Sequence, residues 1–234
     1  MTASQILVIV PARGGSKRLP GKNLRVLGGK SLVAHTATFL KAEGFLDCAV
    51  LSTDDVAIAE EGRRVGLSVP FMRPAALSSD SATTVSVVLH ALEHAREEGR
   101  DPDVVALLQP TSPFRRPGLL RDAIGLLVSR PDANSVVAMT PLHVAARFVF
   151  SQSTSGAAVP LSDGDQCALV PSGSMYVVRT PGLLAQGIYA PPVLALEVKG
   201  QEAIDIDTPE DLKLAEAIFA ARGQANAIRL EVKV

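Results

Sequence analysis

Short apolar runs that are typical of β-strands alternate with helix-like segments over most of this chain. Each strand-like run has three to five residues, and the helix-like segments repeat apolar residues at helical spacing. The expected strands are Ile6–Val10, Cys48–Ser52, Val69–Phe71, Val104–Leu108 and Ser135–Met139, and the expected helices are Ser31–Ala42, Asp54–Val65, Thr83–Glu98 and Gly118–Val128. Alternation of this kind implies crossover connections and a mostly parallel sheet. The sequence therefore predicts an α/β fold.

The alternation breaks at Pro141. Segment Pro141–Ser172 contains prolines and many Ser, Gly and Thr residues, and its apolar residues show little periodicity, apart from a possible short strand at Phe148–Phe150. The strand-like run Ser174–Val178 follows it and resumes the sheet. We therefore expect one domain over residues 1–222, with an insertion at about 141–172 that forms a small subdomain.

The C-terminal part is expected to begin with a strand-like run, Ile204–Asp207, followed by a helix, Thr208–Ala221. Thr208 with Asp211 three residues later is typical of a capping box at a helix N-terminus. Residues 223–234 are expected to form a tail, and the alternation from Ile228 to Val234 allows an edge strand there.

Composition excludes several classes of protein. The net charge of −1, the absence of Trp and an aromatic content of 4% argue against a nucleic-acid-binding surface. No apolar run reaches the roughly 20 residues that span a bilayer, and residues 1–5 carry no basic residue of the kind that opens a signal peptide. The two cysteines, Cys48 and Cys167, have no metal or redox spacing. We expect a cytoplasmic protein with reduced cysteines and no membrane or nucleic-acid partner.

The stretch after the first expected strand, residues 11–23, reads PARGGSKRLPGKN and is both glycine-rich and basic. Its glycines are Gly14, Gly15 and Gly21, and its cations are Arg13, Lys17, Arg18 and Lys22. Glycine lets the backbone approach a ligand closely. A basic, glycine-rich loop at the carboxyl end of a parallel strand is suited to a polyphosphate. We call residues 11–23 the glycine-cation loop.

The spacing in this loop matches neither a P-loop nor the GxGxxG fingerprint of dinucleotide-binding proteins, which excludes an NAD-dependent dehydrogenase. The functional interpretation is that backbone N–H groups of Gly14, Gly15 and Ser16, together with the cations, cradle a triphosphate. Arg13 would grip phosphate oxygens as a fork, whereas Lys17 and Lys22 would act as point charges. Asn23 offers an amide to a base edge. The alternative is a surface turn with solvated lysines.

Two carboxylates, Asp205 and Asp207, lie two residues apart, so on a strand both would point to one face. Such a pair repels unless a cation bridges it. Magnesium accepts one or two protein carboxylates and completes its shell with phosphate oxygens and water. The alternative is that these carboxylates are solvated or cap a helix, and for Asp211 the helix-stabilising role is favoured.

Gln109 follows the expected strand Val104–Leu108, at the carboxyl end where α/β sheets bind ligands. Its amide could contact a ligand or stabilise a turn. Arg115 and Arg116 either border the mouth of such a site or belong to a solvated face.

Four segments resemble, in the right order, the acylneuraminate (sialic acid) cytidylyltransferases, also called CMP-nonulosonate synthetases. They are the glycine-cation loop, RPAALSSDSATT at Arg73–Thr84, LQPTSPFR at Leu108–Arg115 and AIDIDTPED at Ala203–Asp211. The resemblance extends from about residue 6 to about residue 220. It implies a three-layer, Rossmann-like nucleotidyltransferase fold, with an inserted subdomain that mediates a homodimer.

The resemblance also implies roles for single residues. It places Gln109 near the reacting hydroxyl of the sugar and Arg73 near the nucleotide, although Arg73 could instead pair with Asp80. Thr84 aligns with a small hydroxyl position that faces cytosine. Residues in or near the inserted subdomain are implied to contact the sugar acid, and these are His143, Arg147 and Tyr176. The segment around Asp205 and Asp207 resembles the metal-binding block of the family, with Mg²⁺ as the cofactor.

The chain departs from the family pattern before Tyr176. The family often reads close to Y-R-x-N-G-[AS]-[IF]-Y, whereas this chain reads ALVPSGSMY. Gly173, Ser174 and Tyr176 match, but Ser172 replaces the asparagine, and the tyrosine–arginine pair is absent. Because this region recognises the sugar, the identity of the acid stays open.

The expected function is transfer of a cytidylyl group from CTP to the anomeric hydroxyl of a nonulosonic acid, with release of pyrophosphate. Arg13, Lys22 and Gln109 are the expected catalytic residues. Two alternatives remain: a 3-deoxy-octulosonate cytidylyltransferase, which shares the element Arg18–Lys22, and a non-catalytic nucleotide-binding regulator.

Overall fold

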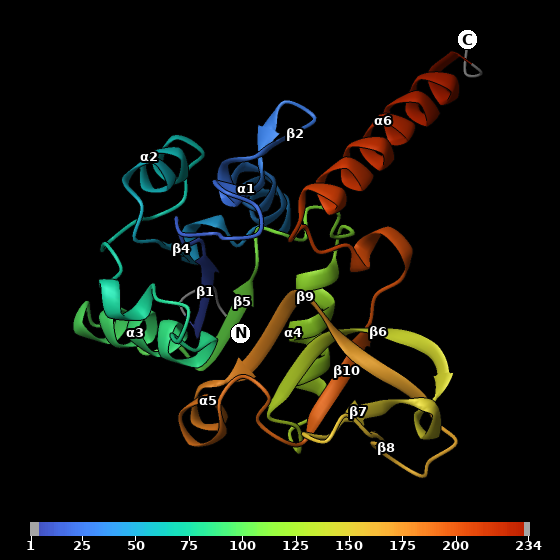
Figure 1. The fold of residues 1–234 in the computed structure, drawn as a ribbon. Helices are drawn as coiled ribbons and strands as arrows, with labels where there is room; N and C mark the ends of the chain where they lie inside the picture. The colour runs from blue at the N-terminus through green and yellow to red at the C-terminus, as the bar shows by residue number, and fades with distance from the viewer. Residues whose placement is uncertain (1–4, 232–234) are drawn as a thin grey trace.

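A computed structural model describes residues 5–231 of the chain, with side chains described through Arg222. Its centre is a six-stranded sheet of order β10-β6-β9-β5-β1-β4 (Figure 1). The strands are β1 Ile6–Pro11, β4 Ala49–Ser52, β5 Val104–Leu108, β6 Ser135–Ala145, β9 Cys167–Arg179 and β10 Val193–Glu197. All neighbouring pairs are parallel except those of β9, which runs antiparallel to β5 and β6. The predicted mostly parallel sheet is confirmed.

Helices cover both faces of the sheet. They are α1 Leu32–Glu43, α2 Val56–Arg64, α3 Thr84–Glu97, α4 Leu119–Ser129, α5 Thr180–Gln186 and α6 Pro209–Glu231. Ile6, Val8 and Val10 of β1 pack in one apolar cluster with α1, α2 and α4, while Leu7 and Ile9 pack in another with α3 and α5. This alternation follows from the two-residue period of a strand. The predicted three-layer α/β fold is therefore confirmed.

The predicted helices of the first half begin where a side chain caps them. Ser31 accepts a hydrogen bond from the Ala34 N–H, Asp55 from the Ile58 N–H and Thr83 from the Ser86 N–H. Each cap satisfies a backbone donor that has no partner within its helix. Each cap lies within one residue of the start that the sequence predicted.

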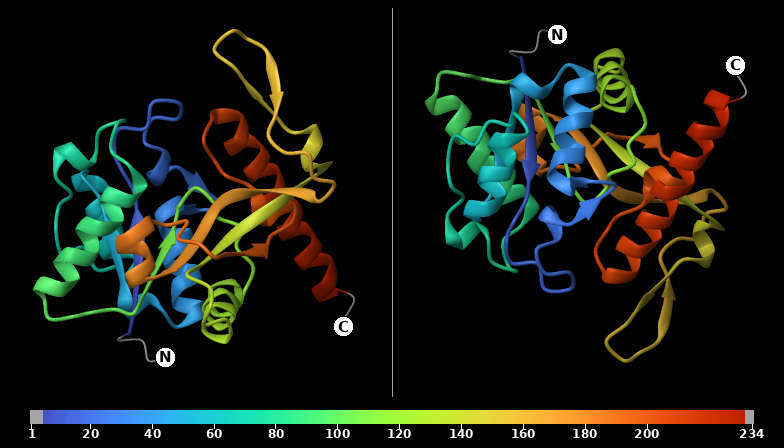
Figure 2. Two further views of the ribbon diagram at one scale, coloured as in Figure 1. Left: turned by 90° about the horizontal axis from the view of Figure 1, so that it is seen from below. Right: turned by 90° about the horizontal axis from the view of Figure 1, so that it is seen from above.

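The insertion forms an arm that projects from the sheet (Figure 2). Strands β6 and β9 extend past the sheet as an antiparallel ribbon whose register shifts between Val137 and Met139. Beyond it lie the 3₁₀ turn η5 Ala146–Phe148 and the hairpin of β7 Phe150–Gln152 with β8 Ala158–Pro160. The predicted strand Phe148–Phe150 is displaced, because Phe148 belongs to η5 and the strand begins at Phe150.

Several predicted strands are wrong. Val69–Phe71 forms no strand, and only a single bridge joins Ser68 to Val50 beside it. Ile204–Asp207 is extended but pairs with no strand. Further short elements are the hairpin of β2 Val26–Leu27 with β3 Lys30–Ser31 and the 3₁₀ turns η2 Lys22–Leu24, η3 Leu46–Cys48, η4 Ala75–Leu77 and η6 Gly200–Ala203.

The edge strand that the sequence allows from Ile228 to Val234 is also wrong over residues 228–231, which are helical. Helix α6 runs on to Glu231 and projects from the body (Figure 1). Alanines precede the alternating apolar residues, arginine and glutamate stand between them, and these good helix formers favour continuation of a helix that is already capped. Residues 232–234 of the predicted tail lie outside the described residues. Among the helices that the structure describes, none has the length and apolarity to cross a membrane.

Candidate functional site

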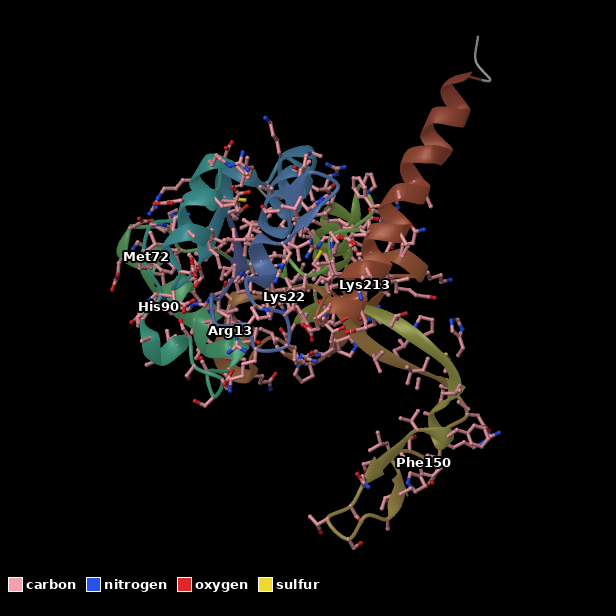
Figure 3. The ribbon with its side chains drawn as sticks, turned by 45° about the horizontal axis from the view of Figure 1, so that its top comes forward. Arg13, Lys22, Met72, His90, Phe150 and Lys213 are labelled. Carbon is pink, nitrogen blue, oxygen red and sulfur yellow. The ribbon has the colours of Figure 1, made fainter. Side chains whose placement is uncertain are left out.

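A cleft of about 480 Å³ lies at the carboxyl ends of β1 and β5. Its walls come from the glycine-cation loop, the segment Arg73–Thr84, the residues after β5 and Asp207, two residues before α6. Nine residues predicted as site residues line it: Arg13, Ser16, Lys17, Lys22, Asn23, Arg73, Thr84, Gln109 and Asp207. Figure 3 shows the labelled Arg13 and Lys22 near one another in the central body, whereas Phe150 lies far out on the arm.

The glycine-cation loop is held by its backbone. The Ala12 N–H donates to the Ser52 carbonyl at 2.9 Å and the Gly14 N–H to Asp54 Oδ1 at 3.0 Å. A Cβ at Gly14 would stand 2.6 Å from an oxygen of Asp55, so this glycine is required by packing against the cap of α2. Around Gly15 a Cβ would meet nothing within 4 Å. Neither of these two glycines lines the cleft.

Carboxylates from distant parts of the chain pair with the cations of the loop. Lys22 Nζ lies 2.6 Å from Asp207 Oδ1, and Arg18 bonds the other oxygen of Asp207. On the opposite wall, Asp80 lies 3.0 Å from Arg13 and 2.5 Å from Lys17.

These pairs bring together residues separated by up to 189 positions. The positive groups near the amino end and the acidic groups near the carboxyl end therefore meet in one cleft. The hydrogen bond and charge of Lys17 hold the pKa of Asp80 below its usual value. Phosphate oxygens are the kind of anion that could take the place of either carboxylate.

Asp205 and Asp207 differ in environment. Asp207 lines the cleft, whereas Asp205 is not among the lining residues. The two stand on an irregular segment that is fixed by the Ile206 N–H, which donates to the Thr111 carbonyl at 2.8 Å. The expectation that both carboxylates share one face of a strand is wrong, because no strand pairs with this segment.

Asp205 is packed against Gly173, whose missing Cβ would lie 3.1 Å from Asp205 Oδ2. Gly173 has φ +80°, so a side chain there would be strained as well as crowded. Burial raises the pKa of Asp205, and among the described residues its Oδ1 is a buried oxygen without a hydrogen-bond partner. A buried acceptor left in this state is costly unless another ligand reaches it.

These donors fit magnesium. Among the described residues, no group of three or more His, Cys, Asp or Glu side chains is arranged to hold a metal. Magnesium does not need one, since it binds through one or two carboxylates and the phosphates of a substrate. The unpartnered oxygen of Asp205 and the hard oxygen donor of Asp207 suit such a site.

Asp211 has the helix-stabilising role that the sequence favours. Its Oδ2 accepts from the N–H groups of Asp207 and Thr208, at 3.0 and 2.8 Å, and from the Thr208 hydroxyl at 2.8 Å. The Asp211 N–H donates in return to Thr208 Oγ1 at 3.2 Å. Burial acts to raise the pKa of Asp211, but these hydrogen bonds leave it below its usual value. The predicted capping box is confirmed, and it anchors Asp207.

Arg73 and Asn23 are buried in the wall of the cleft. Arg73 donates to the Ser52 carbonyl at 3.1 Å and lies 4.0 Å from Asp54, and burial lowers its pKa. Asp80 therefore pairs with loop cations, not with Arg73. Asn23 donates its amide to the Arg13 carbonyl at 2.9 Å, so that part of the side chain holds the loop.

Arg115 and Arg116 do not border the mouth. Arg115 is buried beneath the sheet end, and Arg116 pairs with Asp122 at 2.6 Å on the surface. Neither lines the cleft. The solvated-face interpretation holds for Arg116 and is wrong for Arg115.

The predicted sugar-contacting residues do not reach the cleft within the chain. His143 and Arg147 stand on the arm, where Arg147 pairs with Asp165 and covers the ring of Phe148 at 4.7 Å. Tyr176 is buried in β9 and packs edge-on against Tyr189, with 5.5 Å between ring centres. Burial raises the pKa of Tyr176.

Sequence reasoning missed Asp80 as a partner of the loop and Asp54 as its anchor. Asp80 stands in LSSDSATT, a polar run that carries no charge pattern relating it to the loop. Asp54 lies two residues after the end of β4, at the same sheet edge as the loop, and that position was a usable signal.

Comparisons with known proteins agree with this geometry. A relative from Legionella pneumophila, named CMP-N,N'-diacetyllegionaminic acid synthase, is 34% identical over 231 residues, which cover 94% of this chain and 99% of that protein. A pseudaminic acid cytidylyltransferase from Campylobacter jejuni is 38% identical over 117 residues, half of each chain.

The fold is similar to a solved structure of CMP:2-keto-3-deoxy-manno-octonic acid synthetase complexed with CTP. The TM-score is 0.68 at 18% identity, covering 93% of this chain and 99% of that one. The model of the family described as "Cytidylyltransferase" matches residues 7–158, well over half of the chain. The protein therefore belongs to the cytidylyltransferase family.

Proposed function

We propose that this protein activates a nonulosonic acid by transferring CMP to it from CTP, with release of pyrophosphate. Membership of the cytidylyltransferase family and the names of its legionaminic and pseudaminic acid relatives support this reaction. The single observation that carries the proposal is the 2.6 Å contact of Lys22 with Asp207 in one cleft. In this proposal Lys22 is the cation that would bind phosphate, and Asp207 beside it is the carboxylate that would bind the metal.

The reaction replaces one bond to phosphorus by another. An oxygen of the acceptor hydroxyl bonds to the α-phosphorus, the bond from that phosphorus to the pyrophosphate oxygen breaks, and the hydroxyl proton is lost to solvent. The barrier is dominated by negative charge around the phosphates, so catalysis depends on positioning and electrostatic stabilisation.

The cations of the loop supply this stabilisation. On binding of CTP, Arg13 and Lys17 exchange Asp80 for phosphate oxygens, and Lys22 exchanges Asp207. The side chain of Lys22 is 18% exposed, so its charge acts with less screening than that of Lys17, which is 78% exposed. Lys22 and Arg13 would therefore stabilise most of the negative charge that develops on pyrophosphate.

Asp205 and Asp207 would hold Mg²⁺, and the exchange of Lys22 to phosphate frees Asp207 to do so. When bound, the ion neutralises phosphate charge and lowers the pKa of the acceptor hydroxyl. Asp205 and Asp207 fix where that charge is placed. Gln109, on the same side as Asp205, would orient the acceptor hydroxyl, while Thr84 and Asn23 border the space for the cytosine.

A homodimer would complete the sugar end of the site. The arm exposes large apolar side chains, with Phe148 59%, Phe150 51% and Leu161 63% exposed. Exposed apolar patches of this kind are typical of protein interfaces. We propose that the arm packs on a second copy of the chain, which would bring His143 or Arg147 to the partner's cleft.

A pyrophosphate-release assay tests the function. CTP is offered with N-acetylneuraminic, legionaminic, pseudaminic and 3-deoxy-octulosonic acids over a range of magnesium concentrations, and UTP and ATP replace CTP in control reactions. We expect release with CTP and at least one nonulosonic acid. Release with octulosonic acid alone would favour that acceptor, and CTP binding without release under any condition would favour a regulator.

A further inference from the structure

Arg115 is a buried cation without an ion pair. It is 8% exposed, and no carboxylate among the described side chains lies within 4.0 Å of it. Burial lowers the pKa of Arg115 to about 9, an effect that the charge of Asp205 partly opposes. Removing a guanidinium from water without a paired carboxylate is costly, so its hydrogen bonds must compensate.

All of the short hydrogen bonds of Arg115 go to two backbone carbonyls. Its Nε and Nη2 donate to the Ser174 carbonyl at 3.1 and 2.8 Å, and Nη2 also donates to the carbonyl of Gln109. The guanidinium lies over the ring of Phe39, 5.7 Å from the ring centre, so this ring covers one of its faces. The planar fork of arginine makes these bonds simultaneously, which a lysine ammonium on its flexible stem cannot reproduce.

The two carbonyls mark the end of a strand pair. In the ladder of β5 with β9, Leu108 pairs with Met175, so the next residues of the two strands are Gln109 and Ser174. Beyond this point the two segments diverge. Gln109 leads toward the cleft, and Gly173 leads toward Asp205. Arg115 donates hydrogen bonds to both segments at the position where the β5–β9 ladder ends.

The residues that Arg115 joins border the reacting end of the site. The missing Cβ of Gly173 would lie 3.1 Å from Asp205 Oδ2 and 3.7 Å from Gln109 Oε1. Gly173 therefore stands between the Gln109 amide and the Asp205 carboxylate, one residue away from the Ser174 carbonyl. A shift of either chain would alter the spacing of these two functional groups.

We propose that Arg115 is a positioning residue of the transfer reaction. By joining the Gln109 and Ser174 carbonyls, it fixes the Gln109 amide and the Gly173 backbone relative to Asp205. It does not line the cleft and so acts through these groups. The inference rests on the proposed function, since it assigns Arg115 to the acceptor side of that reaction and not to CTP binding.

The test compares Arg115→Lys, which keeps the charge but loses the fork, with Arg116→Lys as the matched surface control. Titration calorimetry gives the number of CTP-binding sites and their Kd, and pyrophosphate release gives kcat per CTP-binding site. For Arg115→Lys we expect kcat to fall by at least about tenfold, because small misplacements at a reacting centre have large effects. Its Kd for CTP, and both values for Arg116→Lys, should stay within about twofold of wild type.

Two results would overturn the inference: an unchanged kcat per CTP-binding site in Arg115→Lys, or a loss of activity that only matches a loss of CTP-binding sites. Crystal structures of the wild type and of Arg115→Lys provide a readout that does not need turnover. We expect the Gln109 amide to move by about 0.5 Å or more, the scale at which functional geometry is lost. If the wild type releases no pyrophosphate, the proposed function fails, and an unmoved Gln109 would separately refute the role of Arg115.

Discussion

At the scale of single residues, two carboxylates offset part of the positive charge of the glycine-cation loop. Asp207 and Asp80 each pair with two cations of the glycine-cation loop. Both carboxylates are partly exposed, so water and salt weaken these pairs and a phosphate can replace them. In the proposed function the same cations would pair with carboxylates before CTP binds and with its phosphates afterwards.

Replacement of Asp207 by Asn separates its two roles. We expect kcat to fall by at least about 100-fold, because the proposed metal would lose a carboxylate ligand, and a correctly held metal contributes several kcal/mol of transition-state stabilisation. In buffer with EDTA, CTP should bind the variant at least as tightly as wild type, since Lys22 no longer has a competing counter-ion. Steady-state kinetics and calorimetry give the two values, and retention of wild-type kcat would contradict the metal role.

Replacement of Asp80 by Asn should tighten CTP binding. Exposed ion pairs are weak, so the expected gain in affinity is about 1.5- to 5-fold, and it should shrink as salt is added. Asp101→Asn is the matched control, since Asp101 pairs with Arg96 at 2.9 Å away from the cleft. Calorimetric titration with CTP at two salt concentrations measures both variants. Weaker binding in Asp80→Asn would mean that Asp80 assists the nucleotide.

At the scale of elements, the sequence predicts the helices and strands whose formation depends on the local pattern of apolar and polar residues. The buried runs became β1, β4 and β5, and the N-caps of α1, α2 and α3 lie within one residue of the predicted helix starts. The failures fall where tertiary contacts decide. Val69–Phe71 is as apolar as a strand, but Pro70 has no N–H to donate to the edge strand β4, and the single bridge to β4 is made by Ser68. The sequences of α5 and β10, in a proline-rich stretch, show no clear periodicity.

The candidate site follows the same division. The glycine-cation loop and Gln109 could be placed because they follow buried strands at the carboxyl edge. The partners of Arg13 and the burial of Arg115 could not be predicted, because they depend on loops that are far apart in the sequence and meet only in the folded protein. Asp205 and Arg73 could likewise be identified as candidate site residues from the sequence, whereas their burial and their contacts are seen only in the structure.

The capping box of α6 links helix stability to the site. Thr208→Ala removes the hydroxyl that accepts from the Asp211 N–H and donates to its carboxylate. We expect a loss of about 1 kcal/mol in the free energy of unfolding, as for other N-cap replacements. Urea denaturation measures it, and Thr208→Ser should stay near wild type. Equal losses in both variants would mean that the methyl group, rather than the hydroxyl, stabilises this end of the helix.

At the scale of the whole molecule, the arm makes the proposed dimer testable. Substituting both Phe150 and Leu161 by Ser removes exposed apolar surface from the arm and should shift the protein from dimer to monomer in sedimentation velocity. Val56→Ser is the control, since Val56 is 65% exposed on α2, in the main body. If the wild type is a monomer, or if the double variant dimerises as well as wild type, the arm is not the interface.

The fold also brings an N-terminal loop and a C-terminal segment together in one cleft. The loop after β1 and the segment before α6 meet across the cleft through Lys22 and Asp207. A crystal structure with CTP and Mn²⁺, a substitute for Mg²⁺ that anomalous scattering can locate, tests this arrangement most directly. The account predicts phosphate oxygens within hydrogen-bond distance of Arg13 and Lys22, and manganese bound to Asp207 with Asp205. CTP bound elsewhere, with Lys22 still paired to Asp207, would contradict it.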